Sequence, residues 1–209
     1  MPTDASRTGK VDRRLEAILA ADIAGYSTLT GADEEGTVRD LKDHQAVVLP
    51  MIGEYGGRVI DTAGDGILAE FASVLNAVKC AIAIQNTMVD RNAAGDPARR
   101  MQFRIGINQG DVVFDENRLY GDGVNVAARL ESIAEPGGIC VSAKVHDEIA
   151  GKLGITCKDL GPRQLKKTSL SPCASIVWTL ATCEEHRHLS PCRHLEGIDR
   201  RPPVHQHVG

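Results

Sequence analysis

Aromatic residues are scarce in this chain, at 3% of 209 residues. Proteins that bind single-stranded nucleic acid stack the bases on aromatic side chains, so the composition argues against that class. A formal net charge of −4 argues equally against a general binder of nucleic acid or of anionic membranes. Because aromatic residues are so few, the hydrophobic 42% of the chain must form a core built mainly from Ala, Val, Ile and Leu. We expect no nucleic-acid partner.

Three further features are missing. No apolar run approaches the roughly 20 residues that span a bilayer, and the polar start MPTDASRTGKVDRR lacks the apolar segment of a secretory signal. No GxGxxG follows a strand pattern, which disfavours a dinucleotide-binding fold. We expect no membrane span and a cytoplasmic location, with one domain over 13–180. Residues 1–12 are expected to be flexible, and the polar, His- and Pro-rich segment 181–209 to be disordered.

The stretch GRVIDTAGDGILAEF, residues 57–71, predicts a hairpin with a carboxylate at its tip. Apolar-rich runs over 58–63 and 67–71 flank Gly64-Asp65-Gly66. An Asp-Gly turn alone is ordinary turn chemistry. A second strand pattern, over 15–22, ends in Asp22. Two strands that each deliver one Asp can place both carboxylates around one or two hard cations.

The order of the predicted elements defines the fold class. Apolar spacing predicts an amphipathic helix over 33–55 and another that begins after Ser73. The stretch 101–114 predicts a second pair of strands. Strand, helix, two strands, helix and strand form the α+β, ferredoxin-like βαββαβ core, with both helices on one side of the sheet. Extra C-terminal strands and helices follow, up to residue 180.

The stretch YGDGVNVAARLESIAEPGG, residues 120–138, predicts a short helix from Val124 onward. Asn125 and Arg129 lie four residues apart and therefore share one helix face. Taken alone, this pair fits a solvated surface as well as a functional one.

Four ordered segments carry a family resemblance: RRLEAILAADIAGYS, GDGILAEF, RIGINQGDV and YGDGVNVAARLE. Over residues 13–180 the chain resembles the catalytic domain of class III nucleotidyl cyclases, the adenylate and guanylate cyclases. The resemblance implies that a nucleoside triphosphate is converted to its 3′,5′-cyclic monophosphate and pyrophosphate, for intracellular signalling. It also implies a head-to-tail homodimer with active sites at the interface, and two Mg²⁺ (or Mn²⁺) ions.

The resemblance also assigns roles to single residues. Asp22 and Asp65 match the two metal-binding aspartates, with the backbone carbonyl of Ile23 as a further ligand. Two carboxylates suit Mg²⁺, which prefers a few such ligands together with substrate phosphates. In the facing subunit, Asn125 matches the residue that orients the ribose, and Arg129 the one that stabilises the α-phosphate.

Two more basic residues match positions that bind the triphosphate. Arg104, in FRIGI, matches an arginine that contacts it, and Lys166, in QLKK, matches the lysine at the terminal phosphates. As basic residues near strand edges, both also fit an ordinary structural role.

The chain departs from the family where the base is recognised. Adenylate cyclases usually carry Lys at the position of Asp61, and Asp or Thr at the position of Arg118. One acid and one cation can bind adenine or guanine, so the pair leaves the base open. Family frequency favours ATP, whereas an acid at position 61 favours GTP. Alternatively, Asp61 and Arg118 form a salt bridge across the dimer, or the domain is catalytically impaired and binds a nucleotide or a partner.

Overall fold

The computed structural model describes residues 12–115, 118–164 and 174–180. The elements are, in chain order, β1 (Asp12–Ile23), α1 (Tyr26–Ala32), α2 (Glu34–Glu54), β2 (Gly57–Asp61), β3 (Ile67–Phe71), α3 (Val74–Ala94), the 3₁₀ turn η1 (Pro97–Arg99), β4 (Phe103–Asp115), β5 (Arg118–Tyr120), α4 (Asp122–Ile133), β6 (Ile139–Ser142), α5 (Ala143–Ile149), β7 (Cys157–Gln164) and β8 (Ala174–Leu180).

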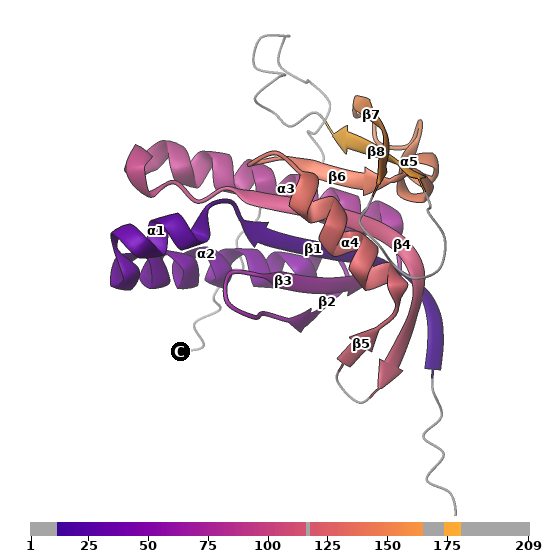
Figure 1. The fold of residues 1–209 in the computed structure, drawn as a ribbon, viewed down its shortest axis with the longest axis horizontal. Coiled ribbons are helices and arrows are strands. Elements are labelled where there is room, and N and C mark those ends of the chain that lie inside the picture. The colour runs from indigo at the N-terminus through magenta and orange to yellow at the C-terminus, as the bar shows by residue number, and fades with distance from the viewer. Residues whose placement is uncertain (1–11, 116–117, 165–173, 181–209) are drawn as a thin grey trace, which may run out of the picture.

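The strands form one sheet in the order β2-β3-β1-β4-β6-β8-β7, and β5 pairs with β4 (Figure 1). The first four strands are antiparallel to their neighbours, with β1 and β3 in the middle. This arrangement confirms the predicted ferredoxin-like core. β6 then joins β4 in parallel, which extends the sheet on that side.

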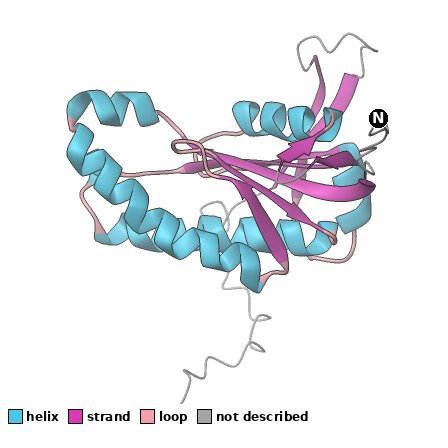
Figure 2. Cartoon of the chain, turned by 90° about the horizontal axis from the view of Figure 1, so that it is seen from below, coloured by secondary structure: helices cyan, strands magenta, loops and turns pink. Residues whose placement is uncertain are grey.

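Helices cover both faces of the sheet (Figure 2). Alternate residues of β1 explain how: Ala17, Leu19, Ala21 and Ile23 pack in the main core beneath α2 and α3, whereas Ile18 and Ala20 pack toward α4. The first two core helices share one face, as predicted, and α4 lies on the other. β1 is therefore apolar at every position from 17 to 21, because both of its faces are covered.

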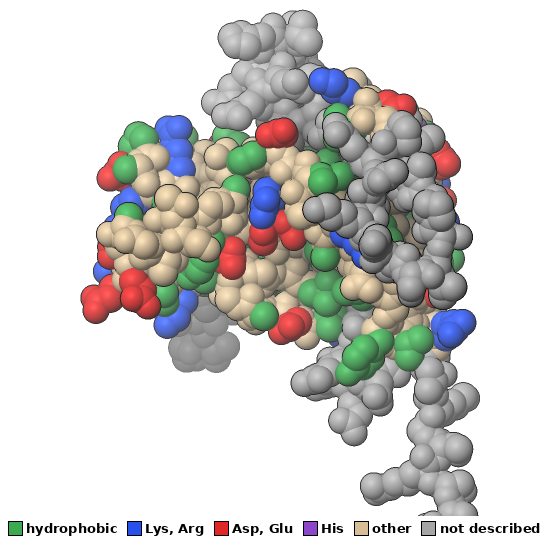
Figure 3. All heavy atoms as spheres, in the orientation of Figure 1, with side chains coloured by type: hydrophobic (Ala, Val, Ile, Leu, Met, Phe, Trp, Pro, Cys, Tyr) green, Lys and Arg blue, Asp and Glu red, His purple; other side chains and the backbone are tan. Residues whose placement is uncertain are grey.

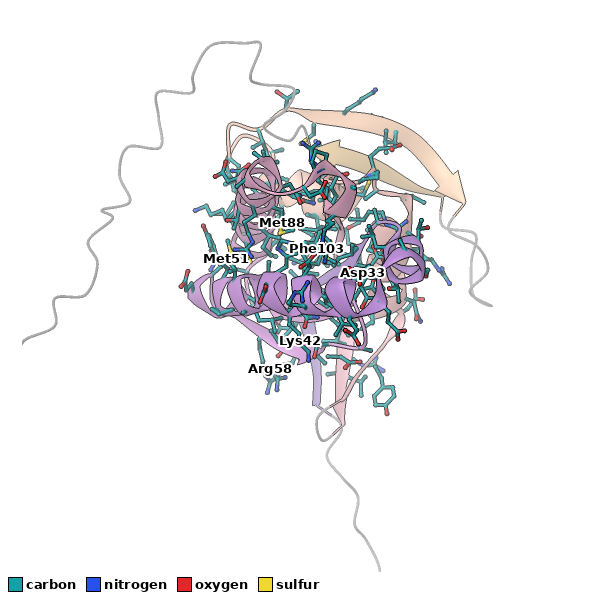
Figure 4. All side chains as sticks on the ribbon, turned by 90° about the vertical axis from the view of Figure 1, so that its left-hand side faces the viewer. Asp33, Lys42, Met51, Arg58, Met88 and Phe103 are labelled. Atoms are coloured by element: carbon teal, nitrogen blue, oxygen red, sulfur yellow. The ribbon has the colours of Figure 1, made fainter. Side chains whose placement is uncertain are left out.

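Residues of α3 lock the main core to the sheet. Met88 and Phe103 are almost fully buried there (Figure 4). The buried Gln85 donates two hydrogen bonds through Nε2, to Phe103 O at 2.9 Å and to Gly138 O at 3.0 Å. α3 is thereby tied to the start of β4 and to the turn that precedes β6.

The helix starts follow the capping residues. The Asp33 side chain accepts a hydrogen bond from Gly36 N at 3.0 Å and begins α2. Ser73 begins α3 in the same way, as predicted, by accepting from Asn76 N. The sequence pattern missed α1, which has no buried residue and hence no apolar periodicity.

One prediction was wrong: the stretch 101–114 is not a pair of strands. β4 runs without a break to Asp115 and pairs with β1 from Ile23 opposite Phe103 to Asp12 opposite Phe114. Gln109-Gly110 resembles a turn in sequence, but Gly110 is a glycine because α4 packs closely against it. A Cβ on Gly110 would lie 3.0 Å from the Cα of Gly123 in α4.

Several sequence predictions fall outside the described residues. They concern residues 1–11, segment 181–209 and Lys166. Within the described residues, no helix has both the length and the apolar character needed to cross a membrane.

Candidate active site

Asp22 and Arg104 form the centre of the site. They are direct neighbours across the antiparallel pair β1 and β4. Arg104 donates from Nε to Asp22 Oδ1 at 2.9 Å and from Nη2 to Asp22 Oδ2. This two-pronged pairing, chiefly through its hydrogen bonds, raises the pKa of Arg104. The predicted metal ligand and the predicted triphosphate-binding residue therefore contact each other directly.

The second aspartate reaches the same point from the β2–β3 hairpin. Asp65 lies in the turn just before β3, as predicted, and its Oδ2 accepts a hydrogen bond from Ile23 N at 3.2 Å. Ile23 directly follows Asp22, so this bond fixes the hairpin tip against the end of β1. The structure thus brings together the three residues predicted to bind metal.

Glu131 of α4 completes this cluster, and the sequence analysis missed it. Its side chain is 14% exposed, and its Oε1 lies 3.4 Å from Arg104 Nη2. Burial, a hydrogen bond with Asp22 and the charge of Asp22 raise the pKa of Glu131 to about 8, against the lowering effect of Arg104. Oε1 is buried and accepts no hydrogen bond from any described residue. Figure 3 shows acidic and basic side chains side by side on this face.

Asn125 and Arg129 lie on the opposite side of α4. Counting about 100° per residue, they lie about 240° and 200° around the helix from Glu131. The residues of α4 that face the sheet are buried, namely Gly123, Ala127 and Leu130. Asn125 is exposed and Arg129 half-buried. Neither is turned toward the Asp22 of its own chain.

The two residues expected at the base lie on different strands, Asp61 on β2 and Arg118 on β5. Asp61 is exposed at the end of β2, opposite Leu68, next to an irregularity in the β2–β3 pairing. Its neighbour Ile60 and its partner Leu68 both pack against the small cluster that contains Ala127 of α4, so this end of β2 lies on the α4 side of the sheet. Arg118 begins β5 and pairs with Asp115 at the far end of β4.

A sequence model of the adenylate and guanylate cyclase catalytic domain matches residues 14–179. This chain belongs to that family. Its cyclase domain is 43% identical over 157 residues to the putative adenylate cyclase 3 of Rhizobium meliloti. The match covers 75% of this chain but only 27% of that relative.

Solved structures agree with the cyclase fold. The crystal structure of an adenylate/guanylate cyclase/hydrolase from Silicibacter pomeroyi has 41% sequence identity and a TM-score of 0.76, and the match covers 82% of this chain and 99% of that one. The adenylyl cyclase CyaB from P. aeruginosa has 24% identity and a TM-score of 0.71, over 82% and 96% of the two chains. The latter likeness supports the fold alone.

The donor set of the cyclase domain fits a hard divalent cation. Asp22 and Asp65 supply carboxylate oxygens beside the backbone of Ile23, and oxygen is the donor that Mg²⁺ and Mn²⁺ prefer. No cluster of three or more His, Cys, Asp or Glu side chains suited to a metal occurs among residues 12–115, 118–164 and 174–180. Arg104 donates hydrogen bonds to both Asp22 oxygens. A cation that binds Asp22 therefore competes with Arg104 for the lone pairs of those oxygens.

Proposed function

We propose that this domain is a nucleotidyl cyclase that converts ATP or GTP to the 3′,5′-cyclic monophosphate and pyrophosphate. The observation that carries the proposal is the hydrogen bond of Asp65 to Ile23, which joins both aspartates at the end of β1. In the reaction, the ribose 3′-oxygen forms a bond to the α-phosphorus, and the bond from that phosphorus to the bridging oxygen of pyrophosphate breaks.

Each residue has a distinct part in this chemistry. Asp22, Asp65 and the Ile23 carbonyl would hold two divalent cations. Such ions lower the pKa of the attacking hydroxyl and neutralise charge on the phosphates. Arg104 and Lys166 would bind the triphosphate. From the facing chain, Asn125 would orient the ribose, and the planar guanidinium of Arg129 would donate to α-phosphate oxygens.

The length of β4 supports a site shared by two chains. Arg104 and Asp115 are eleven residues apart on β4, or about 36 Å along the strand. Asp22 pairs with the first and Arg118 with the second. A nucleoside triphosphate is shorter than that, so Asp22 and Arg118 of one chain would serve different substrate molecules. Head-to-tail pairing lets each substrate meet Asp22 of one chain and Arg118 of the other.

Surface character supports the same pairing. Asn125 and Arg129 point away from the Asp22 of their own chain, which suits a role on a substrate held by another chain. Leu15 and Tyr120 are 57% and 47% exposed, and both pair with the distal half of β4. Exposed apolar side chains beside the base-recognition residues suit a contact between chains.

The experiment that tests the proposal is incubation of the purified protein with ATP or GTP, in Mg²⁺ and in Mn²⁺. Cyclic nucleotide and pyrophosphate are quantified by chromatography. Formation of one cyclic product supports the mechanism and identifies the base. A folded dimer that binds nucleotide without turnover would instead support the impaired domain, for which the unusual pair Asp61 and Arg118 is the motivating observation.

Mixed dimers test the shared site. Asp22→Ala or Asp65→Ala should abolish metal-dependent turnover without unfolding the chain. Mixing Asp65→Ala chains with Arg129→Ala chains should restore part of the activity, because one of the two active sites of the heterodimer keeps every residue. Full activity of the Asp22 or Asp65 variant would refute the two-metal assignment. Absence of rescue in verified heterodimers would refute head-to-tail pairing.

A further inference from the structure

Asp22 cannot bind Arg104 and a cation at full strength at the same time. Both of its oxygens accept hydrogen bonds from the guanidinium, so a cation at Asp22 meets a positive charge already in place. The arginine must weaken its hold when the cation arrives. At that moment it also has to stay close, because the proposed function needs it at the triphosphate.

Glu131 is the other acid within reach of this guanidinium. Its Oε1 lies 3.4 Å from Arg104 Nη2, is buried, and has no hydrogen-bond donor among the described residues. The unused acceptor therefore already faces the arginine. α4 holds it firmly, because Leu130 and Ala127 on the same side of the helix are fully buried against the sheet.

We propose that Glu131 is a positioning residue that holds the Arg104 guanidinium when a divalent cation occupies Asp22. This inference rests on the proposed function for the identity of the cation site. Glu131 does not bind substrate itself. It lowers the cost of separating Arg104 from Asp22 and keeps the arginine beside the site.

The test is a double-mutant cycle on Mn²⁺ binding without nucleotide, followed by the electron paramagnetic resonance signal of free Mn²⁺. Arg104→Ala should bind Mn²⁺ more tightly than the wild type, because a competitor for Asp22 is gone. Glu131→Gln should bind it about threefold more weakly or worse, a typical coupling for residues in contact. In the Arg104→Ala background, Glu131→Gln should change the affinity far less.

Two results would overturn the proposal. Equal weakening by Glu131→Gln in both backgrounds would mean that Glu131 acts on the cation directly. Unchanged or weaker Mn²⁺ binding by the Arg104→Ala variant would mean that Arg104 does not compete with the cation for Asp22. Glu131→Asp keeps the carboxyl group and should fall between wild type and Glu131→Gln, which protects the test against a misfolded Gln variant. Glu135→Gln is the matched control, since Glu135 is exposed and lies just beyond the end of α4.

Failure of the proposed function gives a different pattern. Asp22→Asn should abolish the Mn²⁺ signal change. Retained binding in that variant would place the cation elsewhere and so refute the metal assignment itself. Loss of binding in Asp22→Asn together with an additive cycle would refute the role of Glu131 alone.

Discussion

Gly106 is the point at which α4 rests on the sheet. The glycine belongs to RIGI on β4, and a Cβ built on it would collide with the backbone of α4 at Ala127 O and Glu131 N. Even the third nearest atom, Leu130 C, would lie only 2.8 Å away, about 0.6 Å short of an ordinary contact of 3.4 Å. Because these are backbone atoms, Gly106→Ala can be relieved only by moving α4 away from β4.

The cost of this movement follows from overpacking. Inserting a methyl group into a well-packed core costs about 1–3 kcal/mol. For a domain of this size, about 2 kcal/mol lowers the Tm by roughly 4–8 °C. The shift also displaces Glu131, Asn125 and Arg129 together, and a misplacement of about 1 Å at a reaction centre can reduce the rate by about 100-fold.

The assay compares thermal unfolding and turnover of Gly106→Ala with those of Gly53→Ala. A Cβ on Gly53 meets no atom within 4 Å, and the residue lies in α2. Alanine there should leave stability unchanged or raise it by up to about 1 kcal/mol through helix propensity. If Gly106→Ala is as stable and as active as Gly53→Ala, the packing of α4 on β4 does not depend on the missing side chain of Gly106.

Three other changes test separate parts of the chain. Gln85→Met removes both hydrogen bonds from α3 and should cost about 1–3 kcal/mol in urea unfolding; a loss no larger than for the exposed Gln102→Met would contradict this. Burial, and then the charge of Arg91, lowers the pKa of His44 below its usual 6.5. The unfolded chain therefore binds more protons below about pH 6.5, and stability should fall as the pH is lowered through this range. His44→Gln should flatten that fall, and parallel stability curves would refute it. Finally, Asp61→Lys combined with Arg118→Asp should shift turnover toward ATP, and an unchanged ratio of products would mean that these residues do not recognise the base.

Much of the fold could be predicted because local signals agreed with the tertiary structure. The Asp65 hairpin, the Ser73 cap and the strand that ends at Asp22 each have a short-range signature. β4 was mistaken for two strands because Gly110 reads as a turn residue in sequence. Glycine is needed at position 110 because Gly123 of α4 approaches it closely. Contacts between distant elements leave no local pattern.

The candidate site divides in the same way. Motifs identified Asp22, Asp65 and Arg104, but only the β1–β4 register reveals that Arg104 donates hydrogen bonds to Asp22. Glu131 stands in the quoted segment YGDGVNVAARLE, yet its role depends on the side of α4 that faces the sheet. Helical spacing carries a usable signal here: Glu131 is two residues from Arg129 and therefore on nearly the opposite side.

The two faces of α4 have a consequence for cooperativity. In the proposed homodimer, one rigid helix touches its own Asp22 cluster through Glu131 and the other active site through Asn125 and Arg129. Any movement that accompanies cation binding at the first site is then felt at the second. Such a coupling is reciprocal by thermodynamic necessity. Cation binding at one active site should therefore change the nucleotide affinity of the other, and loosening α4 with Gly106→Ala should reduce that change.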